Sequence, residues 1–260
     1  MSESSSGDDL WLRRYHPVRN PAARLVCLPH AGGSAPFFRP VSAALFPDQE
    51  APGPGVEVVA VQYPGRQERR AEQPIDDIAV LADRISGILR CQPELPVTIF
   101  GHSMGAILAF EVARRLEADG RGPVRLFASG RRGPSVYRNE TVHLRDDAGI
   151  LAELRKLNGT ASAVLGDDEL MRAALPSLRA DYRAAETYIS APDATVSCPI
   201  SVLTGDNDPK TTIEEAKEWA RHTTGSCDFH VFAGGHFFLT DRSAEIIELL
   251  QQHFVAEHAS

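Results

Sequence analysis

Ser103 lies at the centre of the sequence Gly101-His102-Ser103-Met104-Gly105, whose residue types suit nucleophilic catalysis. The apolar run Val97–Phe100 precedes it, and small and apolar residues follow it at 106–116. A serine placed where a buried strand turns sharply into a helix exposes its hydroxyl above the sheet, and the flanking glycines let the backbone pass close by. This context predicts that Ser103 is a nucleophile, in preference to a serine that only caps a helix.

A serine hydroxyl needs a base to take its proton and an acidic group to orient that base. His236 lies in a glycine turn directly after a predicted strand, whereas His230 lies within that strand. Asp206 and Asp208 follow the preceding predicted strand, which gives the chain order of serine, acid and histidine expected for such a site. We predict His236 as the base. We favour Asp208 over Asp206 as the orienting acid because Asp208 lies further from the strand end, and we expect Asp206 to form hydrogen bonds within its turn.

When a serine attacks an acyl group, the negatively charged oxygen that forms needs two backbone N–H donors. We expect one from Met104, which follows the nucleophile, and one from Ala31, in the glycine-rich turn after the first predicted strand. Two neighbouring histidines, His30 and His102, belong to no metal-ligand pattern. We interpret them as supporting residues and predict no metal site.

Short apolar runs alternate with helical patterns along the chain, which predicts an α/β fold with a mostly parallel central sheet and helices on both faces. In such a sheet the active site lies beyond the carboxyl ends of the strands, and each motif above follows a predicted strand. The predicted strands are Leu25–Leu28, Val56–Val61, Val97–Phe100, Val124–Ala128, Ile200–Thr204 and Phe229–Phe232, and the predicted helices lie at 36–45, 75–89, 106–116, 213–222 and about 246–254.

About seventy residues separate the fourth and fifth predicted strands, whereas a simple crossover needs about a dozen. Helical patterns occupy 150–157 and 169–188 of this stretch. Asn158-Gly159 and Pro176 are expected to interrupt them. We therefore predict a helical lid at about 135–195 that covers the carboxyl edge of the sheet and shapes the substrate pocket.

The composition is typical of a single domain, with 260 residues, 43% of them hydrophobic and 24% charged. The net charge of -8 argues against a nucleic-acid partner. The polar, acidic N-terminus does not resemble a signal peptide, and no segment is apolar for long enough to cross a membrane. We expect one domain over 1–260, a cytoplasmic monomer with a flexible N-terminus at about 1–20 and an exposed loop at 47–55.

Six short motifs stand out along the chain: Leu28-Pro-His-Ala-Gly-Gly-Ser34, Gln62-Tyr-Pro-Gly-Arg66, Phe100-Gly-His-Ser-Met-Gly105, Arg179-Ala-Asp-Tyr182, Gly205-Asp-Asn-Asp208 and Gly235-His-Phe237. Together they resemble type II thioesterases of polyketide and nonribosomal peptide synthetase pathways, which have the α/β-hydrolase fold. The resemblance runs from about residue 24 to 255. The first glycine loop and the Tyr-Pro-Gly-Arg segment carry it most specifically, because the serine motif is shared by all α/β-hydrolases.

The resemblance implies an editing enzyme that hydrolyses unwanted acyl groups from the phosphopantetheine arm of an acyl or peptidyl carrier protein. It places Ser103, Asp208 and His236 at the triad positions. It also places Ala31 and Met104 at the oxyanion positions. It implies no cofactor, since the arm belongs to the partner.

Three alternatives stay open. A product-releasing thioesterase shares the triad but normally sits at the end of a multidomain synthase. A general carboxylesterase or lipase would act on freely diffusing esters. A noncatalytic binding protein on the same scaffold is disfavoured by the intact set of catalytic residue types.

Carrier proteins are generally acidic near the serine that bears the arm, so an enzyme that is itself acidic needs a local basic patch to bind them. Arg131 and Arg132 follow the fourth predicted strand at the edge where the active site opens, and Arg66 follows a neighbouring strand. We predict these three as carrier-docking residues. The alternative is that they are solvated or paired within the enzyme.

Overall fold

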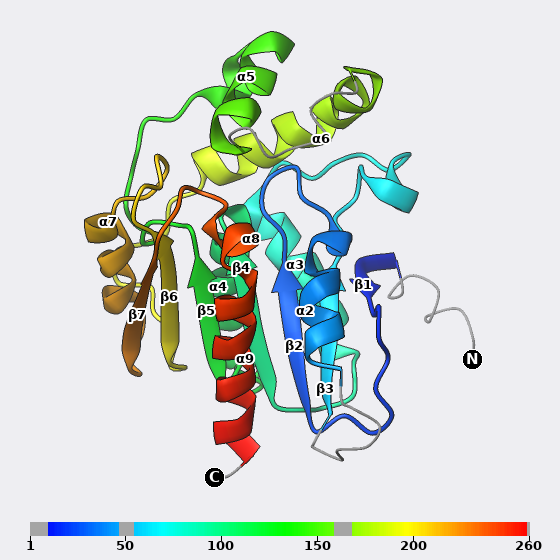
Figure 1. The fold of residues 1–260 in the computed structure, drawn as a ribbon, viewed down its shortest axis with the longest axis vertical. Helices are drawn as coiled ribbons and strands as arrows, with labels where there is room; N and C mark the ends of the chain where they lie inside the picture. Colours follow the sequence, from blue (N-terminus) through cyan, green and yellow to red (C-terminus); the bar gives the residue numbers. More distant parts are fainter. Residues whose placement is uncertain (1–9, 47–54, 159–167, 259–260) are drawn as a thin grey trace.

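The computed structural model describes residues 10–46, 55–158 and 168–258. Within these ranges, seven strands form one sheet in the order β1-β3-β2-β4-β5-β6-β7 (Figure 1). Strands β2 to β7 pair in parallel, and β1 alone runs antiparallel, against β3. The predicted sheet is confirmed. The strands are β1 (Leu12–Arg13), β2 (Ala23–Leu28), β3 (Val56–Val61), β4 (Val97–His102), β5 (Arg125–Ser129), β6 (Ile200–Gly205) and β7 (Cys227–Phe232).

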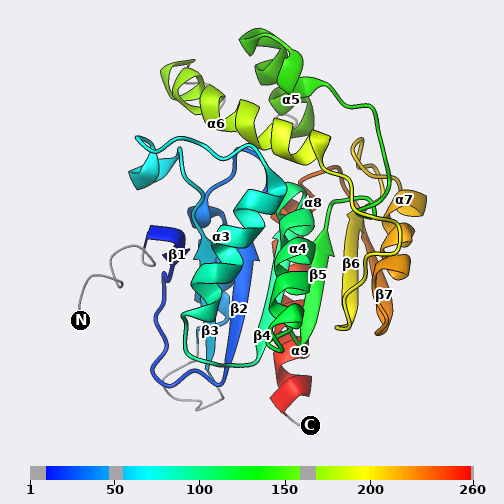
Figure 2. The same ribbon diagram turned by 180° about the vertical axis from the view of Figure 1, so that it is seen from behind.

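Helices cover both faces of the sheet (Figures 1 and 2). On one face lie α3 (Ile78–Arg90) and α4 (Met104–Ala118), and on the other lie α2 (Arg39–Ala44) and α9 (Ser243–His258). The remaining described elements are α5 (Asp147–Asn158), α6 (Asp168–Thr187), α7 (Ile213–Lys217), α8 (Phe238–Asp241) and 3-10 turns at Ala35–Phe38, Gln67–Arg69, Val142–Leu144 and Glu218–His222. No helix in the described ranges is both long and apolar enough to cross a membrane.

Helix α3 illustrates how the apolar spacing sets the buried face. Ile78, Leu81, Ile85 and Leu89 recur every three or four residues and are all buried against the sheet. The helix begins at Ile78 rather than at the predicted residue 75, because the Asp77 carboxylate accepts a hydrogen bond from the N–H of Val80 and caps it there.

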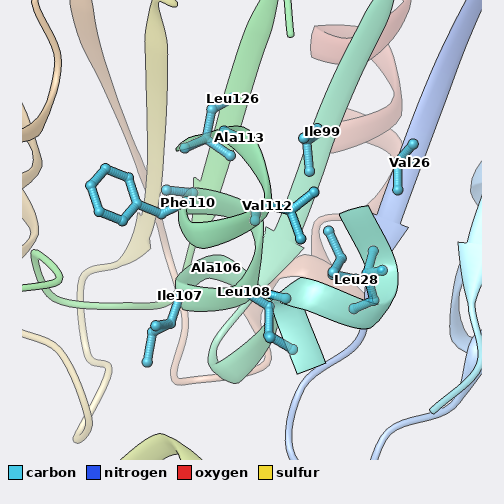
Figure 3. Close-up of a cluster of buried hydrophobic side chains, with 14 of the residues drawn as sticks. Val26, Leu28, Ile99, Ala106, Ile107, Leu108, Phe110, Val112, Ala113 and Leu126 are labelled. Atoms are coloured by element: carbon cyan, nitrogen blue, oxygen red, sulfur yellow. The ribbon is translucent and has the colours of Figure 1, made fainter. Parts of the chain in front are cut away.

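The core around α4 holds the serine motif in place. Side chains of the central strands, among them Leu28, Ile99 and Leu126, pack against α4 (Figure 3). Ala106 and Ala113 on α4 are fully buried in the same cluster. Small side chains at these positions let the helix lie close to the sheet, so the start of α4 is fixed relative to the end of β4.

Helices α5 and α6 lie beyond the carboxyl ends of the strands, where the lid was predicted (Figure 1). Together with the 3-10 turn Val142–Leu144 they form a small apolar cluster, made of Val142, Ile150, Leu175, Leu178 and Tyr182. Helix α6 continues through Pro176, so the predicted interruption there is wrong. The proline lies on the exposed side of the helix, where water can bond the carbonyl that loses its partner. The other predicted interruption, at Asn158-Gly159, adjoins residues 159–167, which lie outside the described residues.

The N-terminal segment from residue 10 is packed onto the sheet, so the predicted flexibility at about 1–20 is wrong for its second half. Leu12 is 3% exposed and pairs with Val61 of β3. The guanidinium of Arg69 lies over the Trp11 ring at 4.1 Å. A two-residue strand is too short to give a periodic signal in the sequence. Residues 1–9 lie outside the described residues, as do residues 47–54 of the loop predicted at 47–55.

Candidate active site

Ser103 lies in a sharp turn between β4 and α4, with φ 56° and ψ -114°. Its N–H donates to the carbonyl of Ser129 on β5 at 2.8 Å, which ties the turn to the neighbouring strand. A Cβ at Gly101 would collide with the carbonyl of Gly105, and a Cβ at Gly105 would collide with the carbonyl of Leu28. The two glycines are therefore needed for the close backbone approach that exposes the serine hydroxyl.

The three residues predicted as a triad form one chain of hydrogen bonds. Nε2 of His236 lies 3.0 Å from Oγ of Ser103, and Nδ1 of His236 lies 2.9 and 3.0 Å from the two carboxylate oxygens of Asp208. A carboxylate only accepts, so Nδ1 donates to Asp208 and Nε2 is left to accept the proton of the serine hydroxyl. His236 is 3% exposed and Asp208 8%, so water competes little for these bonds.

Asp206 lies in the same turn and faces away from the histidine. Its carboxylate accepts from the N–H of Gly234 at 2.9 Å and from the side-chain amide of Asn207 at 2.8 Å. It ties together the two turns that carry Asp208 and His236. The geometry therefore places the two aspartates as predicted, one at the histidine and one within the turn.

Two further histidines are packed around His236. The His102 ring centroid lies 5.2 Å from that of His236, and Nδ1 of His102 bonds the Ser129 hydroxyl at 3.0 Å. The His30 ring lies edge-on to Phe37 and Phe237, with centroids 4.7 and 4.8 Å away. Burial, followed by the charges of His236 and Arg66, lowers the pKa of His30 to about 3. Burial also holds the pKa of His102 well below its ordinary value. Both rings are thus neutral near neutral pH and serve as packing around the base.

Because of these two histidines, the protein is expected to become less stable as the pH falls from about 6.5 toward 3. In the folded protein both rings stay neutral, whereas in the unfolded chain both take up protons near pH 6.5. The unfolded state then binds more protons, so the free energy of unfolding rises with pH and falls with acidification. His30 is expected to account for about 2 kcal/mol between pH 7.5 and pH 5, and His102 acts in the same direction. Urea unfolding at the two pH values measures the change.

A His30→Phe variant is the matched control, because phenylalanine fits an aromatic cluster and does not titrate. Between pH 7.5 and pH 5, its free energy of unfolding should change by less than that of the unsubstituted protein. The difference should equal the contribution of His30. Equal pH dependence of the variant and the unsubstituted protein would contradict the assignment of this effect to His30.

Ala31 lines the pocket above Ser103, and Met104 is the first residue of α4, directly after Ser103. In the turn after β2, the N–H of Gly32 donates to the Asp181 carboxylate at 2.7 Å, and that of Gly33 donates to the carbonyl of His30 at 2.9 Å. The N–H groups of Ala31 and Met104 have no hydrogen-bond partner within the described part of the chain. Neither of the two predicted donors is therefore committed to another acceptor in this part of the chain.

Comparison with known proteins bears on the family of this chain. A family model for the thioesterase domain matches residues 23–254. The chain belongs to the thioesterase domain family. Its members are serine-type thioester hydrolases with the α/β-hydrolase fold, so the predicted fold class and the predicted enzyme class are both confirmed.

Three similar proteins come from natural-product biosynthesis. The chain is 58% identical over 230 residues to a probable cadicidin biosynthesis thioesterase of Streptomyces griseus, across 88% of this chain but 62% of that protein's length. It is 47% identical over 250 residues to the thioesterase PikA5 of Streptomyces venezuelae, across 95% of this chain and 86% of that protein. The solved structure of the type II thioesterase BorB, from the borrelidin biosynthetic cluster, superposes with a TM-score of 0.87 at 50% identity, across 94% of this chain and 98% of that one.

The pocket of this thioesterase above Ser103 is narrow, with a volume of about 30 Å³. Leu154 of α5 and Tyr182 of α6 line it, together with Arg131 and Lys210.

Of the three arginines predicted to dock a carrier protein, Arg131 and Arg132 are buried, so that prediction is wrong for these two, and Arg66 is half-buried. Arg131 is 8% exposed and donates to the carbonyl of Ala185 at 2.9 Å. Burial and the neighbouring charge of Arg132 lower the pKa of Arg131 to about 9. Arg132 is 3% exposed and pairs with Glu140 at 2.8 Å, and Arg66 pairs with a carboxylate of α6. Pairing within the protein, the alternative considered above, describes all three.

Reasoning from the sequence missed Asp181, which is 1% exposed and bonds both Arg66 and the loop that contains Ala31. It belongs to the motif Arg179–Tyr182, but a carboxylate in a polar helix looks like a surface residue. The sequence would have indicated its role only if Asp181 had been recognised as the partner of Arg66, and these two residues lie 115 positions apart.

Proposed function

We propose that this thioesterase is an editing enzyme, which hydrolyses aberrant acyl groups from the phosphopantetheine arm of carrier proteins in polyketide or nonribosomal peptide biosynthesis. The observation that carries the proposal is the hydrogen-bonded chain of Ser103, His236 and Asp208, which supplies a nucleophile, its base and an orienting acid beneath α5 and α6. The biosynthetic clusters named for the similar proteins support the pathway class. The match to 98% of the BorB chain, a type II thioesterase, supports editing rather than product release.

The proposed reaction begins when Nε2 of His236 accepts the proton of the Ser103 hydroxyl and the serine oxygen attacks the thioester carbon. The carbonyl oxygen becomes negatively charged and accepts hydrogen bonds from the N–H groups of Ala31 and Met104. The carbon–sulfur bond then breaks, the sulfur takes the proton from His236, and the arm leaves as a free thiol. The acyl group remains on Ser103 as an ester.

Hydrolysis of that ester repeats the same steps with water. His236 takes a proton from the water molecule, whose oxygen attacks the ester carbon, and then returns the proton to Ser103 as the carboxylic acid leaves. Asp208 keeps the imidazole in the tautomer that accepts at Nε2 and stabilises it when it is protonated. All the groups that these steps require belong to the chain, so the proposal includes no cofactor besides the arm of the partner.

We also propose that the segment at about 135–195 acts as a lid. Its helices contribute Leu154 and Tyr182 to the walls of a narrow pocket of about 30 Å³. Entry of a thioester on a long arm therefore requires a displacement of this segment.

The proposal predicts a strong preference for acyl groups on a carrier protein. The same propionyl group is presented on a carrier protein, on coenzyme A and as a p-nitrophenyl ester, and deacylation of the carrier is followed by mass spectrometry. We expect kcat/KM for the carrier substrate to exceed that for the ester by at least about tenfold, because only the carrier makes contacts beyond the acyl group.

Two outcomes would contradict this proposal. A kcat/KM for the p-nitrophenyl ester equal to or above that for the carrier would identify a general carboxylesterase. Release or cyclisation of a full-length chain, with short acyl groups left on the carrier, would identify a product-releasing thioesterase.

A further inference from the structure

An ion pair that is largely shielded from water joins lid helix α6 to the loop that follows β3. The guanidinium of Arg66 donates from Nη1 and Nη2 to the two carboxylate oxygens of Asp181, at 2.7 and 2.8 Å. The side chains of Arg66 and Asp181 are 9% and 1% exposed. A bidentate pair shielded from water in this way holds both residues in one geometry.

Both members of the pair also bind the backbone of the turn after β2. Oδ2 of Asp181 accepts from the N–H of Gly32 at 2.7 Å, and Nη1 of Arg66 donates to the carbonyl of Gly33 at 3.0 Å. Gly32 has a φ of 75°, in the left-handed region that glycine adopts freely. The two contacts fix the backbone immediately after Ala31, so they set the direction of the peptide that carries the Ala31 N–H.

Other side chains of α6, close to Asp181 in the sequence, also pack against these loops. A Cβ at Gly32 would collide with the Leu178 side chain, so leucine and glycine are in close contact. The Ser177 hydroxyl donates to the carbonyl of Gly65 at 2.5 Å. Ser177, Leu178 and Asp181 lie on one face of the helix, which therefore rests directly on the two loops.

We propose that Asp181 is a positioning residue for the oxyanion hole. By accepting from Gly32 and pairing with Arg66, it keeps the Ala31 N–H aimed at the position where the oxyanion forms. The inference rests on the proposed function, in which Ala31 is one of the two donors. Because Asp181 belongs to α6, the same contacts hold α6 in place on the two loops. The movement of the lid that admits the substrate is therefore assigned to α5.

The test is an Asp181→Asn variant, which keeps the shape of the side chain and loses its charge. We expect kcat for thioester hydrolysis to fall by about tenfold to a hundredfold and KM to change by less than about twofold, because the oxyanion exists only in the transition state. The affinity for a boronic acid that forms a tetrahedral adduct on Ser103 should fall by a similar factor. Binding of a non-hydrolysable thioether analogue of the substrate should stay unchanged.

Two controls separate positioning from stability. In the double variant Arg66→Met, Asp181→Leu both charges are removed together, so the protein is expected to fold while kcat stays low, since Gly32 has lost its acceptor. Arg183→Ala breaks a different ion pair of α6, with Asp76 at 2.9 Å, whose side chains are 61% and 47% exposed. This variant should keep the kcat of the unsubstituted enzyme.

A kcat close to that of the unsubstituted enzyme in the folded double variant would overturn the proposal, because the ion pair would then serve stability alone. Equal losses of boronic acid and thioether binding in Asp181→Asn would also overturn it. If Asp181→Asn does not fold, the double variant decides. Failure of the proposed function would be recognised separately, by hydrolysis that persists in Ser103→Ala.

Discussion

Replacement of Ser103 with alanine is expected to lower kcat/KM for thioester hydrolysis by at least about 10⁴-fold and to leave the fold intact. The loss is large because no acyl-enzyme can form without the hydroxyl, and only the oxyanion donors and substrate binding remain to accelerate hydrolysis by water. The side chain makes one hydrogen bond, to His236, and packs little, so the Tm should change by only a few degrees. Thiol release from an acyl thioester measures the activity, and circular dichroism measures the Tm.

A fluorophosphonate probe provides the control for this experiment, because it labels only a serine that a neighbouring base activates. The unsubstituted protein should be labelled at Ser103 and the alanine variant should not. Hydrolysis close to that of the unsubstituted protein in a correctly folded Ser103→Ala protein would refute the assignment of the active site.

Replacement of Asp208 with asparagine is expected to lower kcat by about 10⁴-fold, the second largest effect. The carboxylate accepts from Nδ1 of His236 and so keeps Nε2 unprotonated and able to take the serine proton. Asparagine can donate to Nδ1 instead, which favours the tautomer that carries its proton on Nε2 and cannot act as the base. Steady-state kinetics at pH 7.5 on the same acyl thioester measure the loss.

Asp206→Asn is the matched control, since it makes the same chemical change two residues away. The Asp206 carboxylate contacts Gly234 and Asn207 and does not touch the histidine, so kcat should fall by less than about tenfold. If Asp206→Asn had the larger effect, the orienting role would move to Asp206.

The elements that carry the triad could be predicted from the sequence because each signal is local. The strand at Val97, the glycines around Ser103 and the turn before His236 are all contained in stretches of about ten residues. These signals can be recognised without knowing which distant residues come into contact. They are a run of apolar residues, glycines around a serine and the order of the motifs along the chain.

The features that were missed depend on contacts or exposure that only the folded protein shows. An arginine follows a strand in the sequence whether it faces water or a buried carboxylate, and only the fold shows that Arg132 meets Glu140 and that Arg66 meets Asp181. The short strand β1 forms because β3 offers an unpaired edge to it, and its own residues carry no periodic pattern. Helix α6 passes Pro176 because the lost hydrogen bond lies on its exposed side.

The backbone of Ser103 has a further consequence, for how the sequence can change over time. A residue with a side chain at φ 56° and ψ -114° is strained, and such strain typically amounts to about 1–3 kcal/mol. Glycine would adopt the same conformation without that strain, so selection for stability alone would favour the loss of the serine. The serine can be retained only as long as its hydroxyl is useful. In a lineage that no longer needed the reaction, this position would be among the first to drift.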